Sequence, residues 1–145
     1  MVGHSAFLRE DPEARIAAFG LPLSLTWEGL QWPFYTDAFS ASWSQLAYNR
    51  VHCPIGDVLI LLVAFWLVAL VWRRGWIGGA GTTPFILFLA VGPGYTLWSE
   101  YFNVHLIQSW AYSRWMPAVF GIGLVPLIQW IVVPAAVVWL TRSVR

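Results

Sequence analysis

Four long apolar segments constrain this chain more than any other feature of its sequence. They cover residues 16–35, 54–72, 83–104 and 117–140. The hydrocarbon core of a bilayer is about 30 Å thick, so a helix needs about 20 apolar residues to cross it. Each segment is therefore predicted to be a transmembrane helix, and no soluble domain is left over. The expected fold is all-α, a polytopic four-transmembrane-helix bundle in residues 16–145 that follows a polar cytoplasmic tail in residues 1–15.

The composition agrees with a membrane protein. Hydrophobic residues make up 59% of the chain and charged residues 10%, whereas soluble domains carry about 25% charged residues. The net charge of +1 and the lack of a basic run argue against a nucleic-acid partner. A single cysteine, Cys53, excludes an internal disulfide and a CxxC motif. The polar N-terminal stretch lacks the features of a signal peptide, so we expect the first apolar segment to persist in the mature protein.

Arginine placement predicts the orientation, because cytoplasmic loops carry an excess of basic residues. The chain has no lysine, and most of its arginines would lie on one side of the membrane: Arg9, Arg15, Arg73, Arg74, Arg142 and Arg145. Only Arg50 and Arg114 would lie on the other side. Both termini are therefore predicted to be cytoplasmic, with residues 36–52 and 105–116 outside.

The first three segments each contain an acidic residue: Glu28, Asp57 and Glu100. At about 1.5 Å per helical residue, their predicted heights above the cytoplasmic face are roughly 20, 24 and 25 Å. Gln129 in the fourth segment lies at roughly 20 Å. Alternating helix direction would place all four side chains in one layer, in the outer third of the bilayer. Since an ionisable group there costs about 2.5–3.5 kcal/mol, we expect a shared interior cluster.

The candidate site consists of these acids and the residues around them. Glu28 is the expected general acid, and Glu100 or Asp57 the expected base. The candidate ligand-binding residues are Trp27, Gln31, Trp32, Tyr35, His52, Trp98, Asn103, His105, Trp110, Tyr112, Arg114 and Gln129.

Local context predicts a setting for the acids. Pro54 suits the first turn of a helix, which would put Asp57 at the favourable end of the helix dipole. The GPG sequence at 92–94 would bend the third helix and open space beside it. We expect the acids to find their partners among the nearby basic residues, namely Arg50, Arg114, His52 and His105.

Each of these residues also has a purely structural interpretation. Asp57 can serve only as a helix-start residue, and Glu100 can form a structural ion pair with Arg114 or His105. Trp and Tyr in the outer loops are typical of an interfacial belt. Neither nearby histidine lies deep in a helix with a partner at ligand spacing, so no metal site, haem or other cofactor is expected.

Several motifs together resemble a group of small four-helix bacterial inner-membrane proteins. They are WEGLQWPFY (27–35), GDVLILLVAFW (56–66), SEYFNV (99–104) and WAYSRWMPAVFGIGLVPLIQW (110–130). The pattern of the group is WE-x-x-Q-x-P-x-Y, GD, an intramembrane Glu, and W-x-Y-x-x-x-MP followed by G-x-GL-x-P-x-x-QW. The resemblance implies a multi-pass protein of the bacterial inner membrane and names no reaction. A looser similarity connects the chain with membrane-embedded isomerases and cyclases of sterols and isoprenoids, by analogy alone.

Two functions stay open at this point. The first is binding of a membrane lipid or an isoprenoid- or sterol-like molecule, with isomerase or cyclase chemistry, because a carboxyl group in an apolar pocket can act as an acid and aromatic faces stabilise positive charge. The second is a non-catalytic accessory or assembly subunit of a larger membrane complex. A proton or metal-ion path is less favoured, since the second segment has no polar residue in 58–72.

Overall fold

The computed structural model of the protein describes residues 11–79 and 81–144, with the backbone alone at 49 and 50. The long helices are α2 (Pro12–Gln31), α4 (Trp43–Trp72), α5 (Thr82–Glu100) and α6 (Leu124–Ser143). The short elements are η1 (Trp32–Phe34), α3 (Asp37–Ser40), η2 (Arg74–Gly78), the π-helix η3 (Tyr101–Leu106), β1 (Ala118–Val119) and β2 (Ile122–Gly123). The described chain is all-α apart from this hairpin, which agrees with the predicted fold class.

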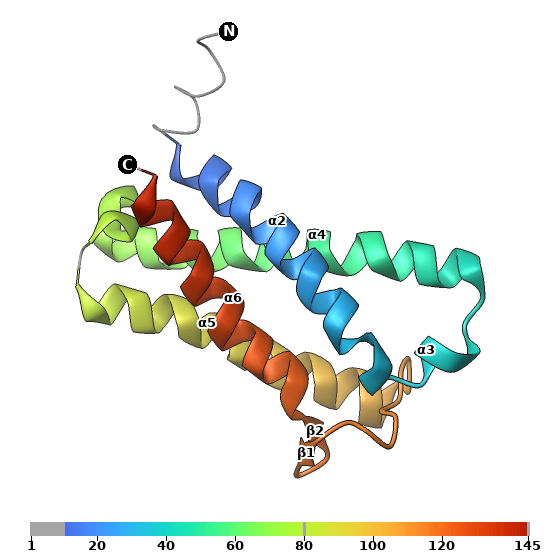
Figure 1. Ribbon diagram of the computed structural model, residues 1–145. Coiled ribbons are helices and arrows are strands. Elements are labelled where there is room, and N and C mark those ends of the chain that lie inside the picture. Colours follow the sequence, from blue (N-terminus) through green and yellow to red (C-terminus); the bar gives the residue numbers. More distant parts are fainter. Residues whose placement is uncertain (1–10, 80, 145) are drawn as a thin grey trace, which may run out of the picture.

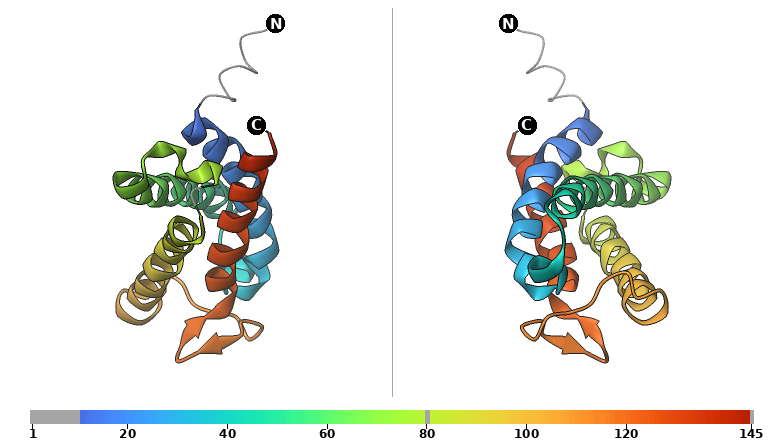
Figure 2. Two further views of the ribbon diagram at one scale, coloured as in Figure 1. Left: turned by 90° about the vertical axis from the view of Figure 1, so that its left-hand side faces the viewer. Right: turned by 90° about the vertical axis from the view of Figure 1, so that its right-hand side faces the viewer.

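The long helices pack into one bundle with two distinct ends. α2 and α6 lie side by side and antiparallel, while α4 packs against α2 and α5 packs against α4 and α6 (Figures 1 and 2). The first described residues of α2 and the last of α6 lie close together at one end, which we call the terminal end. η1, α3, η3 and the hairpin lie towards the opposite end, which we call the hairpin end.

Buried and exposed polar contacts join the helices at the terminal end. Arg15 is buried, and its Nη1 atom donates a hydrogen bond of 3.0 Å to the carbonyl oxygen of Thr141. Arg74, just after α4, pairs with Asp11 at 3.2 Å and with Glu13 at 2.5 Å. These contacts connect the start of α2 both to the end of α6 and to the connection between α4 and α5. Most of the predicted tail 1–15 lies outside the described residues, as do Arg9 and Arg145.

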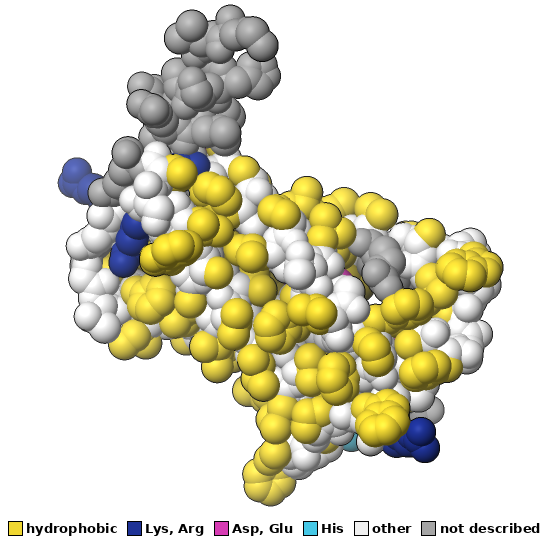
Figure 3. Space-filling model, in the orientation of Figure 1, with side chains coloured by type: hydrophobic (Ala, Val, Ile, Leu, Met, Phe, Trp, Pro, Cys, Tyr) yellow, Lys and Arg dark blue, Asp and Glu magenta, His cyan; other side chains and the backbone are white. Residues whose placement is uncertain are grey.

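The outer surface of the bundle is largely apolar. In the described part of the chain, two helices, α4 and α6, are long and apolar enough to cross a membrane, by length and composition alone. Large apolar side chains face outward, including Leu30 at 68%, Leu70 at 82% and Trp139 at 67% exposure. Figure 3 shows that yellow hydrophobic side chains cover much of the viewed face, with arginine side chains towards its two ends. Soluble monomers rarely expose so much apolar surface, so this surface weakly favours a membrane protein.

Helix α4 begins much earlier than the predicted segment 54–72. Its N-cap is Ser42, whose hydroxyl oxygen accepts a hydrogen bond of 3.4 Å from the backbone N–H of Gln45. The helix then continues through Pro54, which lies inside it rather than in its first turn. The prediction that Asp57 occupies the first turn is therefore wrong, because an upstream serine cap starts the helix and the proline is accommodated within it.

The other helix boundaries also differ from the predicted segments. α2 starts before 16–35 because Asp11 caps it, accepting a hydrogen bond of 3.1 Å from the backbone N–H of Glu13. α6 starts later than 117–140 because the β1–β2 hairpin comes first. The two turn residues of this hairpin, Phe120 and Gly121, have φ angles of 51° and 77°. Positive φ at both central positions is typical of the tight turns that match strand twist.

Gly92 permits close packing between α5 and α6. A Cβ atom at this position would lie 2.2 Å from Cε3 of Trp130, so the indole occupies the space that a side chain would need. α5 continues as an α-helix through residues 92–94. The predicted open space beside the GPG sequence is thus filled at Gly92, because glycine lets an aromatic ring approach the helix backbone.

The apolar core lies nearer the terminal end of the bundle. Ile16 of α2, Phe65 of α4 and Val137 of α6 are fully buried and belong to one cluster. The indole of Trp76 in η2 extends this cluster and packs against the ring of Phe88, with centroids 5.3 Å apart. This packing fixes the relative positions of the helices that carry the candidate acids.

Candidate functional site

Glu100 is the most buried of the three candidate acids and lies at the end of α5. Only 5% of its surface is exposed. The hydroxyl of Tyr35 donates a hydrogen bond of 3.2 Å to Glu100 Oε1, and the hydroxyl of Tyr112 donates a short one to Oε2. The two tyrosine rings lie 5.8 Å apart between their centroids. Two phenols from distant parts of the chain therefore hold one buried carboxyl group.

Backbone pairing brings these phenols together. The N–H of Thr36 donates to the carbonyl of Ala111 at 2.9 Å, and the N–H of Ser113 donates to the carbonyl of Phe34 at 2.9 Å. Tyr35 and Tyr112 form the antiparallel bridge between these bonds. We call residues 33–36 and 111–113 the loop clasp. Through this bridge the side chains of both tyrosines reach Glu100.

Tyr112 also connects the acid to the hairpin. Its hydroxyl oxygen accepts a hydrogen bond of 2.9 Å from the backbone N–H of Gly123. Burial and the hydrogen bond to Glu100 raise the pKa of Tyr112 above its usual value of 10.0. The phenol therefore stays protonated at neutral pH and keeps its proton directed at the carboxyl group.

Asp57 meets its partner between α4 and α6. The amide Nε2 of Gln129 donates a hydrogen bond of 2.7 Å to Asp57 Oδ2, and Gln129 is 3% exposed. Ser24 of α2 is fully buried and lies near Asp57. The surroundings of Asp57 are therefore polar and drawn from three helices.

Glu28 belongs to a polar stripe on α2. The amide Nε2 of Gln31 donates a hydrogen bond of 2.7 Å to Glu28 Oε1, and Gln31 Oε1 accepts one of 3.1 Å from the indole N–H of Trp27. Glu28 is close enough to Asp57 and to Tyr35 to interact electrostatically with both. Since Tyr35 also binds Glu100, a chain of polar neighbours links the three acids. We call these three acids the carboxylate cluster.

The basic side chains predicted as partners of the acids make other contacts. The guanidinium of Arg114 lies over the ring of Trp115, 4.6 Å from its centroid. His52 Nδ1 lies 3.3 Å from the hydroxyl of Tyr48, and His105 Nε2 lies 2.9 Å from the carbonyl oxygen of Gly121. These three side chains are exposed, so they need no buried carboxylate as a partner. The side chain of Arg50, the fourth predicted partner, lies outside the described residues.

The remaining candidate residues are spread around the cluster. Trp98 is 59% exposed and stacks on Phe102 instead of lining the interior. Asn103 donates a hydrogen bond of 2.8 Å to the carbonyl of Ser99 rather than to an acid. The indole nitrogen of Trp110 is buried near Glu100 without completing a hydrogen bond. Trp32 lies half-buried in η1.

Two residues that matter to this site are not among the predicted ones. Ser24 lies one helical turn before Glu28 on the same face of α2, so helical spacing could have identified it. Ser113 forms part of the loop clasp and donates a hydrogen bond of 2.8 Å to the carbonyl of Pro33. No local pattern marks Ser113, because its role depends on two loops that meet only in the folded protein.

The described residues contain no group of three or more His, Cys, Asp or Glu side chains that could hold a metal ion. What the cluster can do chemically follows from its donors. The described partners of Asp57 and Glu100 are amides and phenols, so each acid can gain or lose a proton without stranding an opposite charge.

Comparison of the chain with protein-family models, with curated proteins and with solved structures finds no match.

Proposed function

We propose that this chain is a multi-pass protein of the bacterial inner membrane, with four spanning helices and both termini in the cytoplasm. Its carboxylate cluster would bind a lipophilic molecule of the isoprenoid or sterol type in the outer third of the bilayer. The largely apolar outer surface and the two long apolar helices support the membrane location. The resemblance of its motifs to small four-helix inner-membrane proteins supports the topology.

The environment of Glu100 is the observation that carries this proposal. Glu100 is buried, and its described hydrogen-bond partners Tyr35 and Tyr112 are neutral phenols rather than cations. Such a group can protonate an alkene or a carbonyl, while a second carboxylate removes a proton elsewhere on the same molecule. Glu28, or Glu100 in place of its predicted role as a base, would then act as the acid, and Asp57 would act as the base. Isomerisation or cyclisation needs no more than this pair and a water-poor site.

The test compares carboxyl-to-amide substitutions inside and outside the cluster. Glu28→Gln and Glu100→Gln are nearly isosteric with the protonated acids, so we expect melting temperatures in detergent close to that of the wild type. We also expect co-purified lipophilic molecules, measured by mass spectrometry of the solvent extract, to decrease. Glu13→Gln is the matched control: it breaks an ion pair with Arg74 at the terminal end and should leave the extract unchanged.

The second candidate is a non-catalytic accessory subunit of a larger membrane complex. It is favoured by the apolar residues that the hairpin end exposes, such as Phe120 at 100% and Trp43 at 87% exposure. Under this alternative Glu100 is ionised and only stabilises the fold, so Glu100→Gln would cost roughly 1–3 kcal/mol, because the amide nitrogen accepts no hydrogen bond and leaves one phenol without an acceptor. An unchanged extract together with this loss of stability would reject the ligand-binding proposal in favour of the subunit.

A further inference from the structure

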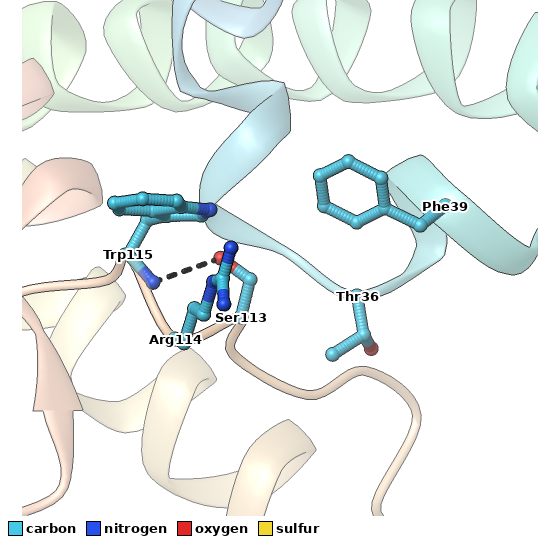
Figure 4. A pocket seen from close by; sticks show the side chains of 5 residues that line it. All are labelled: Thr36, Phe39, Ser113, Arg114 and Trp115. Carbon is cyan, nitrogen blue, oxygen red and sulfur yellow. Dashed lines mark hydrogen bonds between the residues drawn. The ribbon is translucent and has the colours of Figure 1, made fainter.

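A hollow at the hairpin end is lined by residues in and beside the loop clasp other than the two tyrosines that hold Glu100. It has a volume of about 400 Å³ and is lined by Thr36, Phe39, Ser113, Arg114 and Trp115 (Figure 4). Thr36 and Ser113, which follow the two tyrosines in the chain, line this hollow, whereas Tyr35, Tyr112 and Glu100 do not. The hollow is therefore a separate place from the carboxylate cluster, although the same backbone pairing builds both.

The clasp gives the hollow a fixed wall. The hydroxyl of Ser113 donates to the carbonyl of Pro33 at 2.8 Å and accepts from the backbone N–H of Trp115 at 3.2 Å. The hydroxyl of Thr36 donates to the carbonyl of Ala111 at 3.2 Å. Both hydroxyls therefore donate their protons to acceptors within the protein and have none left to donate to a ligand. The donors left for a ligand come from the side chains of Arg114 and Trp115.

Arg114 supplies a positive charge that the described residues leave without a carboxylate. The salt bridges in the described part of the chain both involve Arg74, at the opposite end of the molecule. The guanidinium lies over the ring of Trp115, and Figure 4 shows these two lining side chains close together. A preoriented guanidinium with free N–H groups favours an anion, and a phosphate above all.

The rest of the wall favours an amphiphile over a free anion. Phe39 is 72% exposed and Trp115 is 59% exposed, so two aromatic rings line the same hollow as the charge. The backbone N–H groups of Thr36, Ser113 and Trp115 already have acceptors in the protein. A free phosphate would find one cation and few other donors, whereas a lipid adds apolar contact with the rings.

We propose that this hollow binds the headgroup phosphate of an anionic phospholipid, with its acyl chains along Phe39 and Trp115. The inference rests on the membrane location proposed above, and it does not depend on what the carboxylate cluster binds. Aromatic residues settle at headgroup level, and an arginine there attracts anionic lipid. The site would anchor a lipid directly beside the loop clasp that holds Glu100.

The test counts lipids bound to the detergent-purified protein by native mass spectrometry during titration with phosphatidylglycerol. Arg114→Gln should weaken the tightest binding step about fivefold. Arg73→Gln is the matched control, since Arg73 is also an exposed arginine but lies directly after α4, far from the loop that carries Arg114. Phosphatidylcholine should bind the wild type more weakly than phosphatidylglycerol does.

Several outcomes would overturn the proposal. Equal weakening by Arg114→Gln and Arg73→Gln would indicate general charge attraction, and no weakening by Arg114→Gln would indicate that the hollow binds no lipid phosphate. Displacement of the lipid by millimolar inorganic phosphate would assign the site to a free anion. Trp115→Leu gives a second measurement and should also weaken binding. If Glu28→Gln changed the co-purified molecules while Arg114→Gln left lipid binding unchanged, only this site would be rejected. If Arg114→Gln weakened lipid binding while Glu28→Gln left the co-purified molecules unchanged, only the proposed function would be rejected.

Discussion

Replacing Gly92 with alanine places one methyl group where α5 and α6 touch. The added Cβ atom would lie 2.2 Å from Cε3, 2.5 Å from Cδ2 and 2.8 Å from Cγ of Trp130. Trp130 is 5% exposed, and the atoms approached belong to the rigid indole rather than to the end of a flexible chain. Either the ring or the helix must therefore move.

Two opposing terms set the size of the effect. Overpacking of a closely packed interior costs about 1–3 kcal/mol, and a contact this short lies at the upper end of that range. Alanine regains about 1 kcal/mol of helix propensity relative to glycine. The expected net loss of unfolding free energy is therefore about 2 kcal/mol, which corresponds to a decrease in melting temperature of roughly 4–8 °C.

Gly94→Ala provides the control for this prediction. Gly94 lies in the same helix, but no atom comes within 4 Å of the position that a methyl group there would take, so only the propensity gain applies. Both variants would be melted in detergent, with loss of helical circular dichroism as the signal. Gly94→Ala should melt at or above the temperature of the wild type. If Gly92→Ala did so too, the inferred α5–α6 contact would be refuted.

Two further predictions concern topology and acid stability. In a cysteine-free background, an impermeant thiol reagent on intact cells should label Ser42→Cys but not Ser143→Cys, and labelling at the second position would contradict cytoplasmic termini. Burial raises the pKa of Glu13 at the terminal end, but hydrogen bonds led by that from Arg74 outweigh it and lower this pKa from 4.5 to about 2. The ionised form is favoured in the fold, so its stabilisation should be complete above about pH 4.5 and lost as the pH falls towards 2. Glu13→Gln should flatten this acid limb of the stability curve, and an unchanged limb would refute the assignment.

Local sequence was sufficient for much of the helical content and for one contact of the site. Long apolar runs indicate helices, because a segment within a bilayer must satisfy its backbone hydrogen bonds internally. The spacing of Glu28 and Gln31 places both on one face of a helix, and their side chains do form a hydrogen bond of 2.7 Å. The start of α4 was less predictable, because Pro54 and Ser42 both suit the beginning of a helix and only one begins it.

The partners of the other acids depend on tertiary structure. Asp57 meets Gln129 because α4 and α6 pack at one particular height, and a shift of one residue along either helix moves a side chain by about 1.5 Å. Glu100 meets Tyr35 and Tyr112 because two loops pair their backbones.

By itself, then, the sequence determined that apolar helices form and that carboxyl groups lie within them, because helix formation depends on the residues within a few positions of one another. The folded structure alone decided that amides and phenols hold Asp57 and Glu100 while Arg114 and His105 stay outside. Their positions in the sequence favoured Arg114 and His105 as partners of the acids. In the fold both side chains are exposed and need no such partner. Tertiary packing instead places neutral donors within hydrogen-bonding distance of the acids: the amide of Gln129 beside Asp57 and the phenol of Tyr35 beside Glu100.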